Sequence, residues 1–98
     1  MIKISKKQAE KNKKLEKIKE KLPKVCVICG NPGNDLAHLL NKQLFPEHYT
    51  EPKNLVILCR DCHVLYDNTI EFRTRQVKLF EQVSKFDLMA ARRWFKRL

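Results

Sequence analysis

Apolar residues are unevenly spaced along the chain, and their pattern predicts helices at both ends with strands between them. Residues 5–22 contain no glycine or proline and are rich in lysine, glutamate and leucine, so they favour a helix. The apolar stripe of this helix, formed by Leu15, Ile18 and Leu22, covers only its last two turns. We therefore expect its first turns to project from the protein and to become ordered on a partner.

Two short apolar runs in the middle of the chain have the length of strands. Residues 35–40 predict the first strand, and the aliphatic residues 55–58 predict the second. The connection over residues 41–53 contains two prolines and is expected to be a loop. Directly after the second strand and its cysteines, residues 63–67 are expected to form the first turns of a helix.

The C-terminal part of the chain is expected to be helical. One helical segment after residue 69 is suggested by four apolar residues, Phe72, Val77, Phe80 and Val83. A last helix is marked by Ser84 and Asp87, whose spacing resembles a capping box. Its apolar face is formed by four residues at helical spacing: Leu88, Ala91, Phe95 and Leu98.

Four cysteines suggest how so small a protein is stabilised. A chain of 98 residues buries little apolar surface, so an additional stabilising element is expected. The cysteines form two Cys-x-x-Cys pairs, Cys26 with Cys29 and Cys59 with Cys62, and this spacing predicts one structural Zn²⁺ bound by four thiolates. Two disulfides are the alternative. The lysine-rich N-terminus has no apolar signal-peptide core, so we expect a cytoplasmic location, where thiols stay reduced.

The charge of the chain points to a polyanionic partner. The formal net charge is +10, and residues 1–24 hold ten lysines against three glutamates. Residues 85–98 are also basic, whereas the middle of the chain is close to neutral. Two cationic segments around a neutral core predict contacts with nucleic-acid phosphates, although lysine runs are often only solvated surface. The candidate nucleic-acid-binding residues are Lys13, Lys14, Lys17, Arg92, Arg93, Lys96 and Arg97. No apolar run is long enough for a membrane span, so no membrane partner is expected.

The segment between the cysteine pairs holds the candidate chemistry. It is 29 residues long, which exceeds the roughly 15–20 residues of an ordinary zinc ribbon. It contains His38 between apolar residues and Asn54 before the second strand, and His63 follows the last cysteine directly. This order, with the Cys-x-x-Cys-His junction, resembles the HNH endonucleases, specifically the zinc-knuckle members of the ββα-metal superfamily. The resemblance covers residues 26 to about 72.

The resemblance implies a role for each of these polar residues. His38, on the first strand, would act as the general base and take a proton from the water that attacks a DNA phosphodiester. Asn54 would brace the loop between the strands. His63, at the start of the helix, would bind a catalytic divalent ion such as Mg²⁺ or Mn²⁺.

The sequence departs from the commonest family pattern at Ala37. Many members have a metal-binding Asp or His directly before the general base, although some carry Ala-His. The replacement ligand that we favour is Asp67, because residues four apart project from the same face of a helix and Asp67 follows His63 at that interval. Asp35 is a second candidate, although on a strand it shares no face with His38.

Simpler explanations of the same residues remain open. His38 could be a hydrogen-bonded core histidine, Asn54 could begin a strand, and Asp67 could be a surface charge. We interpret His48 as a loop residue and Trp94 as a packing group. The protein as a whole could be a non-catalytic nucleic-acid-binding module on the same scaffold, or an assembly factor that docks through its last helices.

The predicted fold class is α+β: a small ββα-metal core with a four-cysteine zinc knuckle, flanked by basic N- and C-terminal helices. Within one domain, residues 1–24 form the N-terminal arm, 25–72 the HNH-like core and 73–98 the C-terminal basic segment. The predicted function is a divalent-metal-dependent DNA endonuclease. Specificity is expected to come from a protein partner or from DNA structure, and the resemblance suggests a phage or mobile-element origin. The sequence leaves the oligomeric state and the DNA structure that is cut open.

Overall fold

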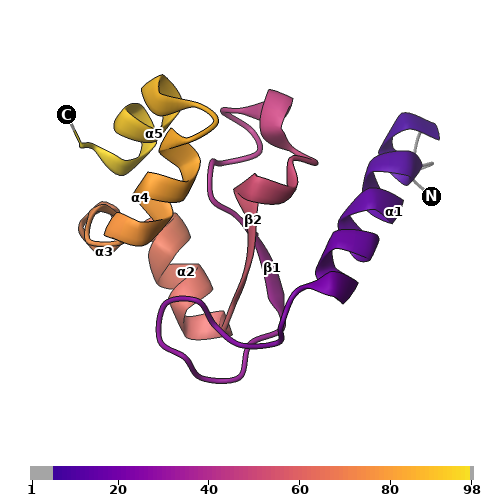
Figure 1. Cartoon of the computed structure of the whole chain (residues 1–98), viewed down its shortest axis with the longest axis horizontal. Coiled ribbons are helices and arrows are strands. Elements are labelled where there is room, and N and C mark those ends of the chain that lie inside the picture. Colours follow the sequence, from indigo (N-terminus) through magenta and orange to yellow (C-terminus); the bar gives the residue numbers. More distant parts are fainter. Residues whose placement is uncertain (1–5, 98) are drawn as a thin grey trace.

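The computed structural model describes residues 6–97, and its elements follow the predicted order of helix, strands and further helices (Figure 1). The first helix, α1, spans Lys6–Lys21 and ends just before Pro23, whose ring is incompatible with a helix interior. Residue 5, which the sequence also assigns to this helix, lies outside the described residues. No side chain of α1 is fully buried, and none belongs to the hydrophobic core. This helix therefore stands beside the core, as Figure 1 shows.

The two predicted strands form a two-stranded antiparallel sheet, which makes the fold a mixture of helices and a small sheet. β1 spans Asp35–His38 and β2 spans Leu55–Leu58, with His38 opposite Leu55. β1 is shorter than the predicted 35–40, because the Leu40 N–H donates to the Asn54 side chain (2.8 Å) and not to a strand carbonyl. All four residues of β2 are buried.

The connection between the strands is more ordered than a loop. It contains two short 3-10 helices, η1 (Pro46–His48) and η2 (Pro52–Asn54). Each begins at a proline, because the fixed φ of proline suits the first position of a helical turn. From the sequence, these two prolines predicted a loop. In the structure each of them begins a 3-10 turn.

The helix expected over residues 63–67 is confirmed, but it begins three residues earlier, before Cys62, because Cys59 caps it. α2 spans Arg60–Asn68 and packs against both strands. Its Tyr66 side chain is fully buried, and the Tyr66 hydroxyl donates to the Leu39 carbonyl at 2.6 Å, just beyond the end of β1. The helix is thereby held against the segment that carries His38.

The single helical segment expected after residue 69 is two helices in the structure. α3 spans Ile70–Thr74 and α4 spans Val77–Ser84. The chain turns at Arg75 and Gln76, so the apolar residues on either side of this break do not share one helical repeat. This turn explains the imperfect apolar spacing in the sequence.

The last helix, α5 (Leu88–Phe95), forms where expected, but its cap differs from the prediction. Ser84 is the last residue of α4, and its hydroxyl donates to the Phe80 carbonyl. Asp87 is the N-cap, and its side chain accepts from the Ala90 N–H at 3.0 Å. Both Ser and Asp are good N-caps, so the sequence alone does not identify which one starts the helix.

The apolar face predicted for α5 is correct only in part. Ala91 and Phe95 are buried, whereas Leu88 is 44% exposed. Leu98 lies outside the described residues. Trp94 packs against the core, as predicted, and stacks on the Arg73 guanidinium at 3.8 Å.

A buried arginine ties the C-terminal helices to α2. Arg73 is 4% exposed and donates to the Tyr66 and Trp94 carbonyls at 2.7 and 3.0 Å. These carbonyls lie near the ends of α2 and α5, where helices leave backbone acceptors without partners. The hydrophobic core runs through the same region, so α2 and the helices after it share one core. No helix that the structure describes is long and apolar enough to cross a membrane.

Candidate functional site

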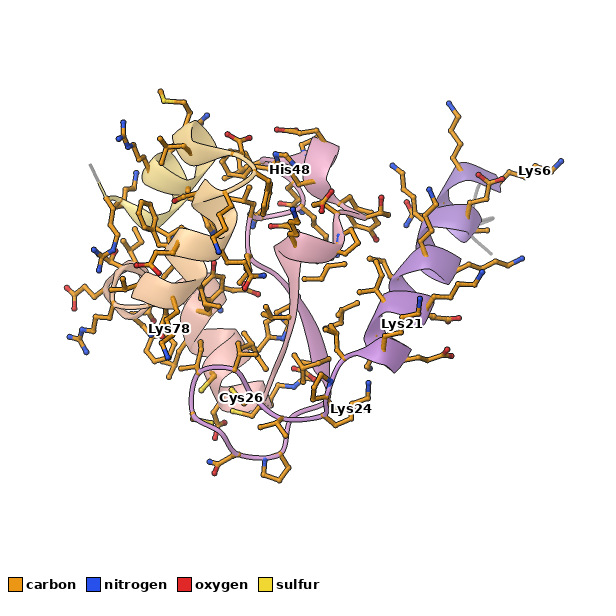
Figure 2. All side chains as sticks on the ribbon, in the orientation of Figure 1. Lys6, Lys21, Lys24, Cys26, His48 and Lys78 are labelled. Carbon is orange, nitrogen blue, oxygen red and sulfur yellow. The ribbon has the colours of Figure 1, made fainter. Side chains whose placement is uncertain are left out.

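The four cysteines lie together at one end of the sheet, and Figure 2 shows Cys26 there with neighbouring sulfur atoms. Their four Sγ atoms all lie within 4.8 Å of one another, and the Cys29 and Cys59 Sγ atoms are 3.7 Å apart. In a tetrahedron with zinc–sulfur bonds of about 2.3 Å, sulfur atoms are about 3.8 Å apart. All four thiols are free of disulfide bonds. The cluster could therefore hold a zinc ion.

The backbone of the first knuckle is shaped by two glycines. Gly30 has a φ of +79°, a left-handed conformation that glycine adopts without strain, and its N–H donates to the Cys26 carbonyl at 3.0 Å. Gly33 lies against the end of β2, where an added Cβ would be 2.9 Å from the Cys59 nitrogen. Only glycine lets the first cysteine pair come this close to the second.

The thiols influence one another's protonation. Burial acts to raise the pKa of Cys26, but backbone N–H groups, including that of Cys29, together lower this pKa to about 6. Burial raises the pKa of the Cys62 thiol, and the neighbouring cysteines raise it further. A divalent cation binds thiolates, so its binding here would release the protons that the neutral thiols hold.

His38 is held by the connection between the strands. Its Nε2 lies 3.0 Å from the Tyr49 carbonyl oxygen, and its ring stacks on the Tyr49 ring at 5.0 Å. A carbonyl only accepts hydrogen bonds, so Nε2 carries the hydrogen and Nδ1 keeps its lone pair in the neutral ring. Burial lowers the pKa of His38 below its ordinary value, and the positive charge of Lys42 lowers it further.

His38 and His63 face the same cavity. This cavity, of about 420 Å³, is bounded by α1, β1, α2 and the start of the connection between the strands, and we call it the cleft. The cleft is lined by Leu15, Leu36, His38, Asn41, Lys42, Tyr49, His63 and Asp67. The structure therefore brings together three of the predicted site residues: His38, His63 and Asp67.

His63 lies between two carboxylates. Its Nδ1 is 2.9 Å from Asp35, and its Nε2 is 3.2 Å from Asp67. Asp35 also pairs with Arg60 at 3.1 Å, and the hydrogen bond from His63 followed by the charge of Arg60 lowers the pKa of Asp35. The two candidate metal ligands thus contact different nitrogens of the ring, so they do not form one compact ligand set with His63.

Asn54 is fully buried and joins the two ends of the connection. Its Oδ1 accepts from the Leu40 N–H at 2.8 Å, and its Nδ2 donates to the His48 carbonyl at 3.1 Å. These bonds hold the segment after β1 against the segment that carries Tyr49. The side chain therefore braces the connection, as the resemblance implies for this residue.

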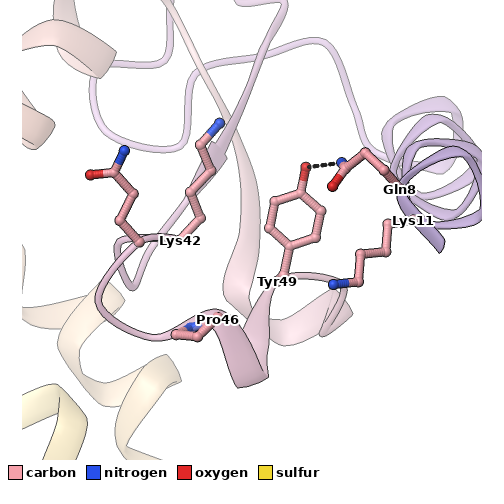
Figure 3. A pocket seen from close by; sticks show the side chains of 6 residues that line it. Gln8, Lys11, Lys42, Pro46 and Tyr49 are labelled. Atoms are coloured by element: carbon pink, nitrogen blue, oxygen red, sulfur yellow. Dashed lines mark hydrogen bonds between the residues drawn. The ribbon is translucent and has the colours of Figure 1, made fainter. Parts of the chain in front are cut away.

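One face of α1 borders a second pocket beside the cleft, which shares Lys42 and Tyr49 with it. Figure 3 shows the Tyr49 ring between Lys42 and two residues of α1. Gln8 donates to the Tyr49 hydroxyl at 3.3 Å, and the Lys11 ammonium lies 5.6 Å from the centre of the Tyr49 ring. Sequence reasoning missed Tyr49, Lys11 and Lys42 as site residues, and only the lysine-rich composition of residues 1–24 hinted at Lys11.

The predicted nucleic-acid-binding lysines of α1 point elsewhere. At 100° per residue, Lys13 and Lys17 lie on the side of α1 that is turned away from Lys11, which lines the adjoining pocket, and from Leu15, which lines the cleft. Lys14 lies to the side. All three side chains are exposed.

The C-terminal cations lie on another part of the molecule. Figure 1 shows α1 and α5 on opposite sides of the sheet. Arg92, Arg93 and Lys96 are exposed, whereas Arg97 is partly buried and donates to the Thr74 carbonyl at 2.8 Å. The two basic segments therefore do not converge on one surface.

A second group of potential ligands lies far from the cysteines. His48 Nε2 is 2.8 Å from Asp87 Oδ2, and Glu47 is close to both. Figure 2 shows His48 at the opposite end of the molecule from Cys26. Within residues 6–97, this group and the four cysteines are the sets of three or more His, Cys, Asp or Glu residues whose ligand atoms lie within 4.8 Å of one another.

The chain was compared with protein-family models, with curated proteins and with solved structures, and none of them matches. A function is therefore inferred from the geometry of the cleft and of the cysteine cluster.

Proposed function

We propose that the protein is an HNH-type, divalent-metal-dependent DNA endonuclease whose fold is stabilised by one Zn²⁺ bound to the four cysteines. The observation that carries this proposal is the cleft, because His38 from β1 and the His63–Asp67 pair from α2 open on the same cavity. A general base and a metal ligand must face one phosphate from two sides, and a shared cavity meets that condition.

His38 has the properties of a general base. Because its Nε2–H is held by the Tyr49 carbonyl, Nδ1 is the atom that accepts a proton from the attacking water. The oxygen of that water bonds to phosphorus as the bond to the leaving oxygen breaks. The lowered pKa keeps the ring neutral, and so able to take the proton, at neutral pH.

The surroundings of His63 fit a divalent ion. A neutral imidazole has one N–H, so it donates to only one of its two flanking carboxylates, and its other nitrogen faces an oxygen lone pair. Donation from Nδ1 to Asp35 would leave Nε2 and Asp67 as the ligand pair, because a histidine ligand commonly has its second nitrogen held by a carboxylate. Their 3.2 Å separation suits two atoms that each bind one ion at about 2.1 Å.

This ion would polarise the scissile phosphate and stabilise the leaving oxygen. In this arrangement Asp35 orients His63 and does not bind the metal. Lys42 lines the cleft and Lys11 lines the adjoining pocket, so both are proposed to attract the DNA phosphates. Lys13, Lys14, Lys17 and the C-terminal cations would contact phosphates farther along the DNA.

A second candidate function is a non-catalytic DNA-binding module on the same scaffold. One observation favours it: Ala37 offers no ligand, so His63 and Asp67 are the two protein ligands that the cleft supplies. DNA binding without cleavage under every divalent ion would support this alternative.

The deciding experiment is cleavage of supercoiled plasmid by the zinc-loaded protein with Mg²⁺ or Mn²⁺. His38→Ala is expected to lower the rate by about 10²-fold or more, since general-base catalysis contributes at least that much. Exogenous imidazole is expected to restore part of the activity, because it can enter the space left by the ring. Asn41→Ala, which alters another residue of the same cleft, is the control. Equal cleavage by His38→Ala, at equal zinc content and equal helical circular dichroism, would remove His38 from the mechanism.

A further inference from the structure

We propose that His48 and Asp87 form a positioning pair, through which the C-terminal helices hold the Tyr49 carbonyl against His38. This inference rests on the proposed function, because it concerns how the general base is oriented. The pair links segments 39 residues apart in the sequence. It lies outside the cleft, since neither residue lines that cavity.

The first link of this arrangement joins the connection between the strands to α5. His48 Nε2 and Asp87 Oδ2 are 2.8 Å apart, and their side chains are only 18% and 30% exposed. Phe86 packs edge-on against the His48 ring at 5.0 Å. Asp87 is fixed in turn, because its other oxygen caps α5 through the Ala90 N–H. The His48 ring therefore docks on a rigid helix start.

The second link joins His48 to the general base. The His48 carbonyl accepts from the buried Asn54 side chain at 3.1 Å. The next residue is Tyr49, whose carbonyl accepts from His38 Nε2 and whose ring stacks on the His38 ring. Backbone bonds also hold this turn, since the Tyr49 N–H donates to the Pro46 carbonyl and the His48 carbonyl accepts from the Glu51 N–H, both at 3.2 Å. Removal of the Asp87 link takes away the side-chain hydrogen bond that docks this turn on the start of α5.

The charge state of the pair supports an orienting role. The hydrogen bond from His48, followed by that from the Ala90 N–H, lowers the pKa of Asp87, so Asp87 is a carboxylate at neutral pH. A carboxylate accepts from His48 Nε2, and such charge-assisted bonds are stronger than neutral ones. The His48–Asp87 pair therefore acts on the cleft through the backbone of the connection between the strands.

The test is the ring tautomer of His38, measured by long-range ¹H–¹⁵N NMR on the zinc-loaded full chain. The chain has three histidines, so each ring is assigned with a single variant. Asp87→Ser keeps an N-cap for α5 but is too short to reach His48. The expected result is a shift of His38 from the single Nε2–H form to a mixture with the Nδ1–H form. Glu81→Ser, which removes an exposed carboxylate from α4, is the matched control and should leave the tautomer unchanged.

Two further variants separate positioning from general destabilisation. His48→Ala is expected to reproduce the His38 tautomer shift of Asp87→Ser. The double variant with both changes should shift no further, because each change removes the same His48–Asp87 hydrogen bond. His48→Gln retains a side-chain N–H that can donate to Asp87, so His38 should stay in the Nε2–H form in this variant. A His38 ring that stays in the Nε2–H form in both Asp87→Ser and His48→Ala would overturn the proposal.

Cleavage kinetics supply a readout of function. Asp87→Ser should lower kcat with little change in KM, since the pair orients the base and does not bind DNA. The NMR measurement needs no cleavage, so it tests the pair independently of the nuclease proposal. If the wild-type protein cuts no DNA, that result counts against the nuclease function alone.

Discussion

Replacing Asn54 with alanine should destabilise the protein more than any surface substitution. The Asn54 side chain is fully buried and satisfies the Leu40 N–H and the His48 carbonyl. Alanine would leave the buried Leu40 N–H without a partner, whereas the His48 carbonyl would keep its bond from the Glu51 N–H at 3.2 Å. A buried group left without a partner costs about 1–3 kcal/mol. The expected loss is therefore about 2 kcal/mol, which is a large part of the roughly 5–15 kcal/mol that stabilises a typical domain.

The loss is measured as the change in the free energy of unfolding in urea, with zinc in excess throughout. Asn41→Ala is the matched control. Asn41 also accepts two backbone hydrogen bonds, from Gln43 and Leu44, but these lie at the surface where water replaces the lost acceptor. This control should cost less than about 1 kcal/mol. Equal losses for the two variants would refute the view that Asn54 braces the connection between the strands.

Three further predictions concern the cysteine cluster and the general base. A strong chelator should unfold the chain cooperatively, as seen in far-ultraviolet circular dichroism, and added Zn²⁺ should refold it, because a small core depends on its metal. Gly33→Ala should lower zinc affinity in a competition assay, since the new Cβ would lie 2.9 Å from the Cys59 nitrogen; wild-type affinity would contradict the packing of the two knuckles. The rate of plasmid cleavage should fall at low pH with a midpoint below 6.5, because burial lowers the pKa of His38 below that ordinary value and the neutral ring is the active form. An acid limb with its midpoint at or above pH 6.5 would show that a different group is titrating.

The elements predicted from local patterns were largely correct. β2 matches its predicted bounds, because four consecutive aliphatic residues between polar segments leave little choice of where the strand begins and ends. The cysteine spacing also predicted a cluster that could hold zinc, since Cys-x-x-Cys turns have a nearly fixed local geometry. β2 and each Cys-x-x-Cys turn depend on residues that are close in the sequence, whereas the meeting of the two pairs depends on the fold between them.

The features that the sequence did not reveal depend on contacts between distant segments. The His48–Asp87 pair joins residues whose identities are ordinary for a loop and a helix cap. The burial of Arg73 was equally invisible, because its partners are backbone carbonyls and not charged side chains. Gln8, Lys11 and Leu15 form the face of α1 that lines the cleft and the adjoining pocket, so Lys13 and Lys17 face away. This face is not apolar throughout, so the sequence pattern did not identify it.

The two proposed metal sites are connected through the first turn of α2. Cys59 is the N-cap of this helix, and its sulfur accepts from the Cys62 N–H at 3.4 Å, so an ion on these sulfurs would fix the helix start. His63 is the next residue, and Asp67 follows one turn later on the same face. A structural ion at the cysteines would therefore set the direction in which His63 and Asp67 project, while Asp35 from β1 contacts the other nitrogen of the His63 ring. In this proposal a short chain holds two imidazoles at one cavity because the cysteine cluster positions His63 and the braced connection between the strands positions His38.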